Sequence, residues 1–189
     1  MRKLAALLVL AAACGQNDNL IVGGVSSGAT TPEVLFDNIG SSIHGVATLR
    51  DAAGHPVGSP LAVVIMSDKP GLCGILAAHR DYFRNAPEAY EALIMVNRLG
   101  YLGTFIIGRG GDEDTAAEIV AASGSQVTTP FHALNSSYIA ITNWADNGGN
   151  ATGSFSLGFD DPYNSGSTHP FYGRFKTSFC PNLEGTLLP

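Results

Sequence analysis

The sequence predicts a mainly β fold, an antiparallel β-sandwich or open barrel of about eight strands with one short helix. Three observations lead to this prediction. Glycine is abundant, with 23 residues, and only 14% of the residues are charged, which is typical of short strands joined by turns. Residues 153–159 and 171–180 alternate with a period of two, so their phenylalanines share one face. A face built of phenylalanine must be covered, and a second sheet is the simplest cover.

Eight segments have the residue pattern of strands. In chain order they are 42–50, 61–66, 93–98, 103–109, 115–123, 137–144, 153–159 and 171–180. The run 61–66 is continuously apolar and rich in β-branched residues, which predicts a central strand buried on both faces. The run 115–123 is compatible with a helix or a strand, and we take it as a strand. Strands 93–98 and 103–109 are expected to pair as a hairpin that turns near Gly100.

One helix is expected, over residues 74–85. It ends before Pro87, because proline cannot continue a helix. A turn is expected at residues 146–150, whose Asp, Asn and Gly side chains tolerate positive φ.

The N-terminus has the pattern of a secretory signal. Arg2 and Lys3 form a short positive region, and residues 4–13 form an apolar run that ends in small residues. This run is too short to cross about 30 Å of hydrocarbon as a helix, which takes about 20 residues. A buried core helix is the alternative interpretation of the run.

Residues 11–14, Ala-Ala-Ala-Cys, resemble a lipobox, the cleavage site of bacterial lipoproteins. That family usually has Leu at the third position before the cysteine, where this chain has Ala11. The resemblance implies that residues 1–13 are removed and that Cys14 carries a diacylglycerol and an acylated amine. Gly15 after the cysteine implies an outer-membrane or cell-surface location, held by a lipid anchor. Cleavage by ordinary signal peptidase, followed by free secretion, is the alternative.

The chain has three cysteines, which leaves one over in an exported protein. Lipidation of Cys14 accounts for the odd one, so Cys73 and Cys180 remain as a pair in an oxidising compartment. We expect a disulfide between them, with two unpaired structural thiols as the alternative. In the loop-entropy model, a bridge that closes about 100 residues contributes on the order of 4–5 kcal/mol.

Three parts are expected along the chain: a signal peptide at 1–13, a flexible tether rich in Gly and Ser at 14–31, and one β-sandwich-like domain at 32–189. Two of the ten Lys and Arg residues lie in the signal peptide, so the mature chain has eight basic and sixteen acidic residues, a formal net charge of −8. Such a surface repels nucleic-acid phosphates and anionic lipid, and we exclude nucleic acid as a partner.

Several short motifs are shared with a family of uncharacterised secreted bacterial lipoproteins. They are Ala12-Ala13-Cys14, Ser67-Asp68 to Cys73, Gly153-Ser154-Phe155, and Gly173-Arg174-Phe175 to Phe179-Cys180. The chain resembles this family in its lipobox, its tether, a mid-chain cysteine after a strand, and paired Gly-x-Phe strands that end in a cysteine. The resemblance implies a β-rich domain closed by a disulfide, with no assigned activity.

Two segments resemble parts of trypsin-like proteases. Residues 21–24, Ile-Val-Gly-Gly, resemble their mature N-terminus, and residues 76–79, Leu-Ala-Ala-His, resemble the segment with their catalytic histidine. Against this, Arg80 stands where that family has a cysteine, and no Gly-Asp-Ser-Gly-Gly supplies a nucleophile. We therefore disfavour a trypsin-like protease and predict no catalytic residue.

No metal or cofactor site is predicted. The five histidines lack metal-ligand spacing: His44, His55, His79, His132 and His169. The acidic turns at 112–114, 146–147 and 160–161 lack EF-hand spacing, although oxygen-rich loops can hold Ca²⁺. Four aromatic residues are candidates for a sugar-binding face, although such residues are more commonly core: Tyr138, Trp144, Tyr163 and Tyr172.

The leading hypothesis is a membrane-anchored envelope lipoprotein with a non-enzymatic binding or structural role. Its membrane contact is the N-terminal lipid, and an envelope protein or a glycan is a candidate partner. One alternative is a hydrolase whose site is assembled from distant residues. Another is a module that binds Ca²⁺ or a glycan.

Overall fold

The computed structural model describes residues 19–22, 24–25, 34–35, 38–49, 51, 53, 55–85, 87–98, 102–108, 115–123, 126–127, 131–160 and 168–188. Its elements are β1 (Leu20–Val22), β2 (Gly24–Val25), β3 (Val34–Leu35), β4 (Ser41–Ala47), β5 (Leu61–Ser67), α1 (Leu72–Ala78), β6 (Tyr90–Arg98), β7 (Gly103–Ile106), β8 (Ala116–Ser123), β9 (Gln126–Val127), β10 (Phe131–His132), β11 (Tyr138–Asn143), β12 (Asn150–Asp160), β13 (Thr168–Phe179) and the 3₁₀ turn η1 (Pro181–Leu183). The expected signal peptide and Cys14 lie outside the described residues. In the described part of the chain, no helix has the length and apolar character needed to cross a membrane.

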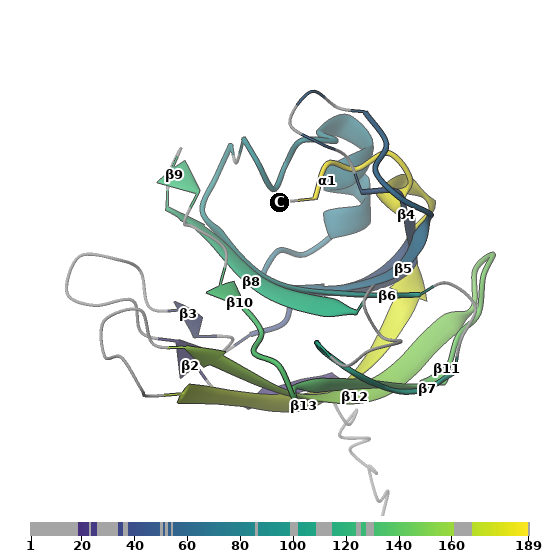
Figure 1. Ribbon diagram of the computed structural model, residues 1–189. Coiled ribbons are helices and arrows are strands. Elements are labelled where there is room, and N and C mark those ends of the chain that lie inside the picture. The colour runs from purple at the N-terminus through teal and green to yellow at the C-terminus, as the bar shows by residue number, and fades with distance from the viewer. Residues whose placement is uncertain are drawn as a thin grey trace, which may run out of the picture.

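Eleven strands form one mixed, largely antiparallel sheet in the order β10-β8-β6-β5-β4-β13-β12-β11-β7, with β9 paired to β8 and β1 paired to β13. The sheet turns back on itself between β4 and β13, so that two layers lie face to face (Figure 1). We call β4, β5, β6 and β8 the first layer, and β7, β11, β12 and β13 the second layer. The predicted mainly β fold with one short helix is confirmed. The two layers are parts of one open sheet, which is not closed into a barrel.

Each of the eight predicted strands overlaps an observed strand, namely β4 to β8 and β11 to β13. The run 61–66 lies within β5, in which every residue is buried. β5 pairs with β4 on one side and with β6 on the other, so the prediction of a central strand is confirmed.

The core between the layers is built from the alternating strands that the sequence predicts. Phe155, Leu157 and Phe159 of β12 are buried together with Phe171 and Phe175 of β13. They pack against apolar side chains of the first layer, among them Val64, Met66, Leu93, Met95 and Ile119. Each fully buried side chain of this size contributes about 1.5–3 kcal/mol relative to an exposed one.

The paired Gly-x-Phe motifs form a cross-strand lock in this core. The register of β12 against β13 places Phe155 opposite Gly173 and Gly153 opposite Phe175. A Cβ at Gly173 would lie 2.7 Å from Cζ of Phe155, and one at Gly153 would lie 2.8 Å from Cε1 of Phe175. Each phenylalanine ring therefore covers the glycine opposite it, which leaves no room for a side chain at either position.

The other side of the first layer, here called its helix side, is covered by α1, the turns at 79–85 and the C-terminal segment 180–188 (Figure 1). The residues that cover it are buried: Leu72 and Leu76 of α1, Tyr82 and Phe83 of the turns, and Leu183 and Leu188 of the C-terminal segment.

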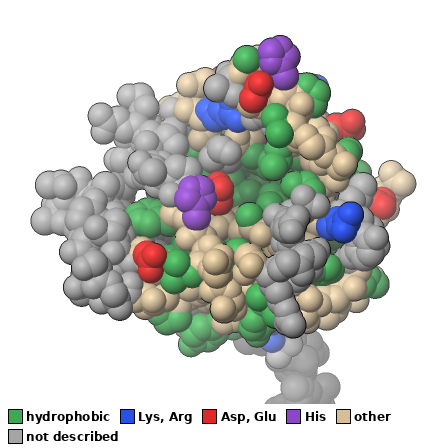
Figure 2. Space-filling model, in the orientation of Figure 1, with side chains coloured by type: hydrophobic (Ala, Val, Ile, Leu, Met, Phe, Trp, Pro, Cys, Tyr) green, Lys and Arg blue, Asp and Glu red, His purple; other side chains and the backbone are tan. Residues whose placement is uncertain are grey.

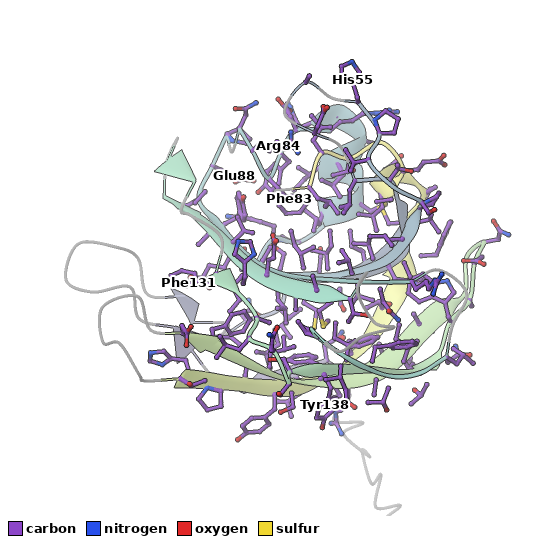
Figure 3. The ribbon with its side chains drawn as sticks, viewed as in Figure 1. His55, Phe83, Arg84, Glu88, Phe131 and Tyr138 are labelled. Atoms are coloured by element: carbon purple, nitrogen blue, oxygen red, sulfur yellow. A yellow bond between two sulfur atoms is a disulfide. The ribbon has the colours of Figure 1, made fainter. Side chains whose placement is uncertain are left out.

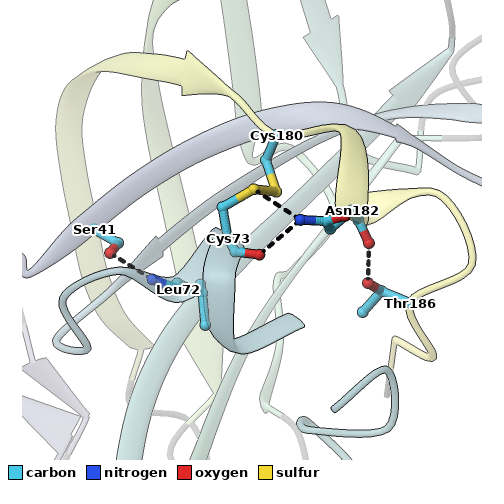
Figure 4. Close-up of a disulfide and its surroundings, with 6 residues drawn as sticks. All are labelled: Ser41, Leu72, Cys73, Cys180, Asn182 and Thr186. Carbon is cyan, nitrogen blue, oxygen red and sulfur yellow. Dashed lines mark hydrogen bonds between the residues drawn. A yellow bond between two sulfur atoms is a disulfide. The ribbon is translucent and has the colours of Figure 1, made fainter. Parts of the chain in front are cut away.

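The predicted disulfide between Cys73 and Cys180 is confirmed, and it ties α1 to the end of β13. The Asn182 side-chain amide donates to the Cys73 carbonyl oxygen at 3.0 Å, and the Thr186 hydroxyl donates to the Asn182 carbonyl oxygen at 2.7 Å (Figure 4). The bond and these contacts hold the C-terminal segment against the helix.

The predicted helix at 74–85 is wrong at both ends. α1 begins at Leu72, whose backbone N–H donates to the Ser41 hydroxyl of β4 at 3.1 Å. This capping group comes from a residue 31 positions away, so the local sequence does not reveal it. The helix ends at Ala78, and the adjacent Tyr82 and Phe83 turn inward to pack with Tyr90 in an aromatic cluster.

The predicted hairpin of 93–98 with 103–109 is also wrong. β6 pairs with β5 on one edge and with β8 on the other, so it has no free edge for β7. β7 instead pairs with β11 in the second layer. The consecutive strands β6 and β7 therefore belong to different layers.

Part of the segment 14–31, expected as a flexible tether, belongs to the folded domain. Leu20–Val22 forms β1, which pairs with β13 through Leu20 and Arg174. The Lys176 backbone N–H donates to Asn19 Oδ1 at 2.8 Å. Gly24–Val25 pairs with Val34–Leu35, and the rest of the segment lies outside the described residues.

Replacing both Cys73 and Cys180 by serine should lower the free energy of unfolding by about 2–5 kcal/mol, because the bridge closes a long loop. Urea unfolding of the oxidised protein measures this loss. Cys14→Ser is the matched control and should leave the transition unchanged. Equal transitions for the double variant and the wild type would contradict the expectation.

Candidate functional site

A row of side chains crosses the helix side of the first layer and changes from aliphatic to charged. The strand registers place one residue of each strand in the row: Ile43 of β4, Ile65 of β5, Ile94 of β6, Glu118 of β8 and His132 of β10. The three isoleucines are buried under α1 and the C-terminal segment. Glu118 and His132 lie beyond this cover, with side chains 25% and 70% exposed.

An apolar pocket of about 110 Å³ opens where the cover of the helix side ends. Its lining residues are Leu49, Ile94, Val96, Ala116, Glu118 and Leu188. The hydrophobic side chains of this face gather in a hollow that is visible in Figure 2. Glu118 is the one ionisable residue in the lining, so the pocket is suited to a small apolar group beside one carboxyl.

Glu118 is paired with His132 across the edge of the sheet. Oε1 of Glu118 lies 2.9 Å from Nδ1 of His132. Burial in the apolar surroundings raises the pKa of Glu118, and the nearby His132 opposes that shift. The contact with His132 uses Oε1 alone, and the second carboxylate oxygen, Oε2, is also able to accept hydrogen bonds.

A second, more open hollow of about 620 Å³ lies on the other side of this pair. It is lined by residues 131–135, which include His132, and by Asp160. The Glu118–His132 pair thus stands between a small apolar pocket and a wide hollow of mixed lining, in which Phe131, Ala133 and Leu134 accompany Asn135 and Asp160. This arrangement favours a ligand that is largely apolar and carries a polar group beside the pair.

Glu118 and His132 can form hydrogen bonds with a ligand, and Glu118 can carry a charge. The described residues around them include no side chain that is placed as a nucleophile. Within the described ranges, no Ser, Thr or Cys side chain is hydrogen-bonded to His132 or Glu118. Nor do three or more His, Cys, Asp or Glu side chains of the described residues come together as metal ligands. Acyl transfer needs a nucleophile within reach of a base, and no described Ser, Thr or Cys meets this requirement at His132.

His44 is a second histidine whose ring is held by hydrogen bonds and aromatic contacts. It is fully buried, its Nδ1 lies 2.9 Å from the Thr177 hydroxyl, and its Nε2 lies 2.8 Å from the Ala145 carbonyl oxygen. Its ring also makes edge contacts with Trp144 and Phe179. Because both ring nitrogens are occupied, His44 is a structural clamp between β4 and the β11–β12 connection.

The remaining sequence candidates lie apart from the pocket. His55 is exposed and lies 3.3 Å from Asp51, His79 is exposed at the end of α1, and His169 lies opposite Phe159 in β12. Trp144 donates to Asp146 at 2.9 Å. Tyr138 and Tyr172 lie on the second layer, whereas Tyr163, residues 112–114 and Asp161 lie outside the described residues.

The sequence did not single out Glu118, although it contains a signal for it. Glu118 is the one charged residue in the run 116–122, Ala-Ala-Glu-Ile-Val-Ala-Ala, on a strand buried on both faces. Burying a single carboxyl group in an apolar strand is costly, so such a residue indicates either the exposed edge of a sheet or a binding site. Its partner His132 and the pocket residue Leu188 are remote in sequence, so the site itself emerges only from the fold.

No protein-family model, no curated protein and no solved structure matches the chain in the three comparisons made with known proteins. The assignment of a function therefore depends on the geometry of the pocket and on the pairing of the cysteines.

Glu118→Gln should change how stability depends on pH. A raised pKa in the folded state means that folding favours the protonated acid. The stability of the wild type relative to the variant should therefore be greatest below the ordinary glutamate pKa of about 4.3 and fall as the pH rises through the raised pKa of Glu118. Urea unfolding at a series of pH values from 4 to 8 measures this difference. Thr104→Ser, a change without a titrating group, should stay parallel to the wild type, and parallel curves for Glu118→Gln would contradict the expectation.

Proposed function

We propose that the protein is an exported, lipid-anchored envelope protein with a non-enzymatic binding role. The observation that carries the proposal is the bond between Cys73 and Cys180, which uses two of the three cysteines. Cys14 then has no cysteine of its own chain to pair with, and it stands at the lipobox-like site. An acyl anchor on Cys14 explains both the odd cysteine and its position after a signal-like segment.

The same bond supports export, because disulfides persist in the bacterial envelope and are rare in the reducing cytoplasm. Cys180 is 1% exposed, and the bond is part of the packing between α1 and the C-terminal segment. Such a bond has a structural role, and its formation needs an oxidising compartment. The outer membrane or cell surface, as the lipobox implies, is the proposed location.

The binding role is supported by the apolar pocket beside Glu118. An open apolar pocket reduces the stability of the free protein because it leaves apolar surface in contact with water. A partly buried carboxyl also reduces it, because the carboxyl loses hydration. A ligand with an apolar end and a hydrogen-bond donor or a cation would compensate for both. The proposed ligand class is therefore a small amphipathic molecule with a donor or cationic head. No described residue beside the pair favours the hydrolase alternative.

The anchor predicts that Cys14→Ser abolishes labelling by a fatty-acid analogue in the producing cells and moves the protein from the membrane fraction to the soluble fraction. Click labelling and fractionation measure these two changes. The Cys73→Ser, Cys180→Ser double variant is the matched control and should keep the label. Unchanged labelling of Cys14→Ser would refute the anchor.

The pocket predicts selective binding of an aromatic amine. Benzylamine should shift the methyl resonances of Ile94 and Leu188, whereas phenylacetate, with the same ring and a carboxylate, should bind much more weakly because Glu118 repels it. Glu118→Gln should weaken benzylamine binding about tenfold, as expected for the loss of a charge-assisted hydrogen bond. Equal shifts with the two compounds, or none at these two residues, would contradict the assignment.

A further inference from the structure

The second layer has one face that no other element of the described chain packs against as a core. Alternate residues of β11, β12 and β13 point away from the phenylalanine core, and the register arranges them in rows. One row joins Tyr172, Ser156 and Tyr138, and the next joins Arg174, Ser154 and Ala140. β1 adds Leu20 beside Arg174. We call this surface the open face: Leu20, Tyr138, Ala140, Ser154, Ser156, Tyr172 and Arg174.

The open face concentrates exposed hydrophobic side chains around a flat centre. Leu20 is 45% exposed, Tyr138 39% and Tyr172 52%, and these are three of the five large hydrophobic residues exposed in the described part of the chain. Serines occupy the strand between the two tyrosines, which therefore lie about 10 Å apart, two strand spacings. Figure 3 shows Tyr138 on the far side of the second layer from the first.

The charge of the open face differs from that of the chain. The chain has a formal net charge of −6, whereas the open face contains Arg174 and is continued along β13 by Lys176. Neither of its two rows contains an acidic residue. Asp160, at the end of β12, is four positions beyond Ser156 of the nearer row, roughly 13 Å along the strand. An anionic surface is therefore complementary to this face although the whole chain is acidic.

The start of the described chain places this face close to Cys14. Asn19 accepts a hydrogen bond from the Lys176 backbone N–H at 2.8 Å, and β1 runs on from Leu20 beside Arg174. Cys14 precedes Asn19 by five residues, which span at most about 18 Å when fully extended. An acyl group on Cys14 would hold the edge of the open face within that distance of the lipid headgroups.

We infer that the open face docks on the phospholipid surface of the membrane that holds Cys14, an inference that rests on the lipid anchor of the proposed function. Tyrosines are favoured at the headgroup level of a bilayer because they combine an apolar ring with a polar hydroxyl. Arg174 is placed to bind a lipid phosphate, for which the guanidinium is well suited. Leu20 adds apolar contact at the edge nearest the anchor.

This docking has a consequence for the pocket beside Glu118. The open face belongs to the second layer and the pocket to the helix side of the first layer, so the two lie on opposite sides of the double layer. With the open face on the membrane, the pocket opens toward the aqueous compartment.

The test uses the full chain, purified from the membranes of the producing cells with 3-fluorotyrosine in place of tyrosine and reconstituted in vesicles of phosphatidylethanolamine and phosphatidylglycerol. A gadolinium-chelating lipid in the vesicles should broaden the ¹⁹F signals of Tyr138 and Tyr172 at least twofold more than those of Tyr82 and Tyr90, which are buried on the helix side. Single Tyr→Phe variants assign the signals. Arg174→Glu should reduce the broadening at Tyr138 and Tyr172, whereas Arg80→Glu, a matched change in the turns of the helix side, should not.

Three outcomes would overturn the docking, and one of them would also overturn the anchor. Equal broadening of all four tyrosines, in a protein that mass spectrometry shows to be acylated at Cys14, would overturn the docking and leave the anchor in place. An unacylated Cys14 would overturn both. If Tyr138 and Tyr172 are not broadened, and cross-linking in the vesicles shows that two copies of the chain pair through this face, the docking is also overturned.

Discussion

The architecture depends on the joint where β4 pairs with β13. It is the one parallel pairing among the described strands, and it is short, with Ser178 opposite Ile43 and Phe179 opposite His44. The next residue, Cys180, donates its backbone N–H to the His44 carbonyl oxygen at 2.7 Å and forms the disulfide to α1. The buried ring of His44 reinforces the joint, since its two nitrogens bind groups of the second layer. Through this joint one sheet becomes two layers, and the phenylalanines of β12 and β13 obtain their cover.

The same joint explains where the candidate site lies. Because β13 leads directly into the disulfide, the C-terminal segment must lie over the end of the first layer nearest β4. Its cover extends to Leu188 and stops short of the β8 edge, where Glu118 meets His132. The pocket thus lies where the apolar face of the first layer extends beyond α1 with its following turns and beyond the C-terminal segment. Its raised glutamate pKa has the same origin, since the apolar neighbours that the cover leaves behind desolvate the carboxyl.

The two sides of the double layer have different surface chemistry. The helix side combines aliphatic and aromatic side chains with one hydrogen-bonded Glu–His pair, which suits a small ligand. The open face combines small hydroxyl residues with tyrosine and arginine, which suits a broad and flat partner. β1 connects this second surface to the N-terminal segment, because it pairs with β13 from Leu20 to Val22. The close approach of the Leu20 carbonyl leaves no room for a side chain at Gly173. A lipid anchor before β1 would therefore orient the whole domain and would not leave it to rotate on a long linker.

The sequence by itself determined the properties that depend on local periodicity and on residue chemistry. These include the strands from β4 to β8 and from β11 to β13, the phenylalanine face, the buried β5 and the pairing of Cys73 with Cys180. Only the tertiary structure decided the partner of β7, the ends of α1, the place of β1 and the pocket at Glu118. The physical reason is the range of the interactions. The alternation of side chains in a strand depends only on consecutive residues, so the sequence reveals it directly. Which strand lies next to another, and how far a covering segment extends, depend on contacts between remote parts of the chain. The contacts of Leu72 with Ser41 and of Glu118 with His132 are examples.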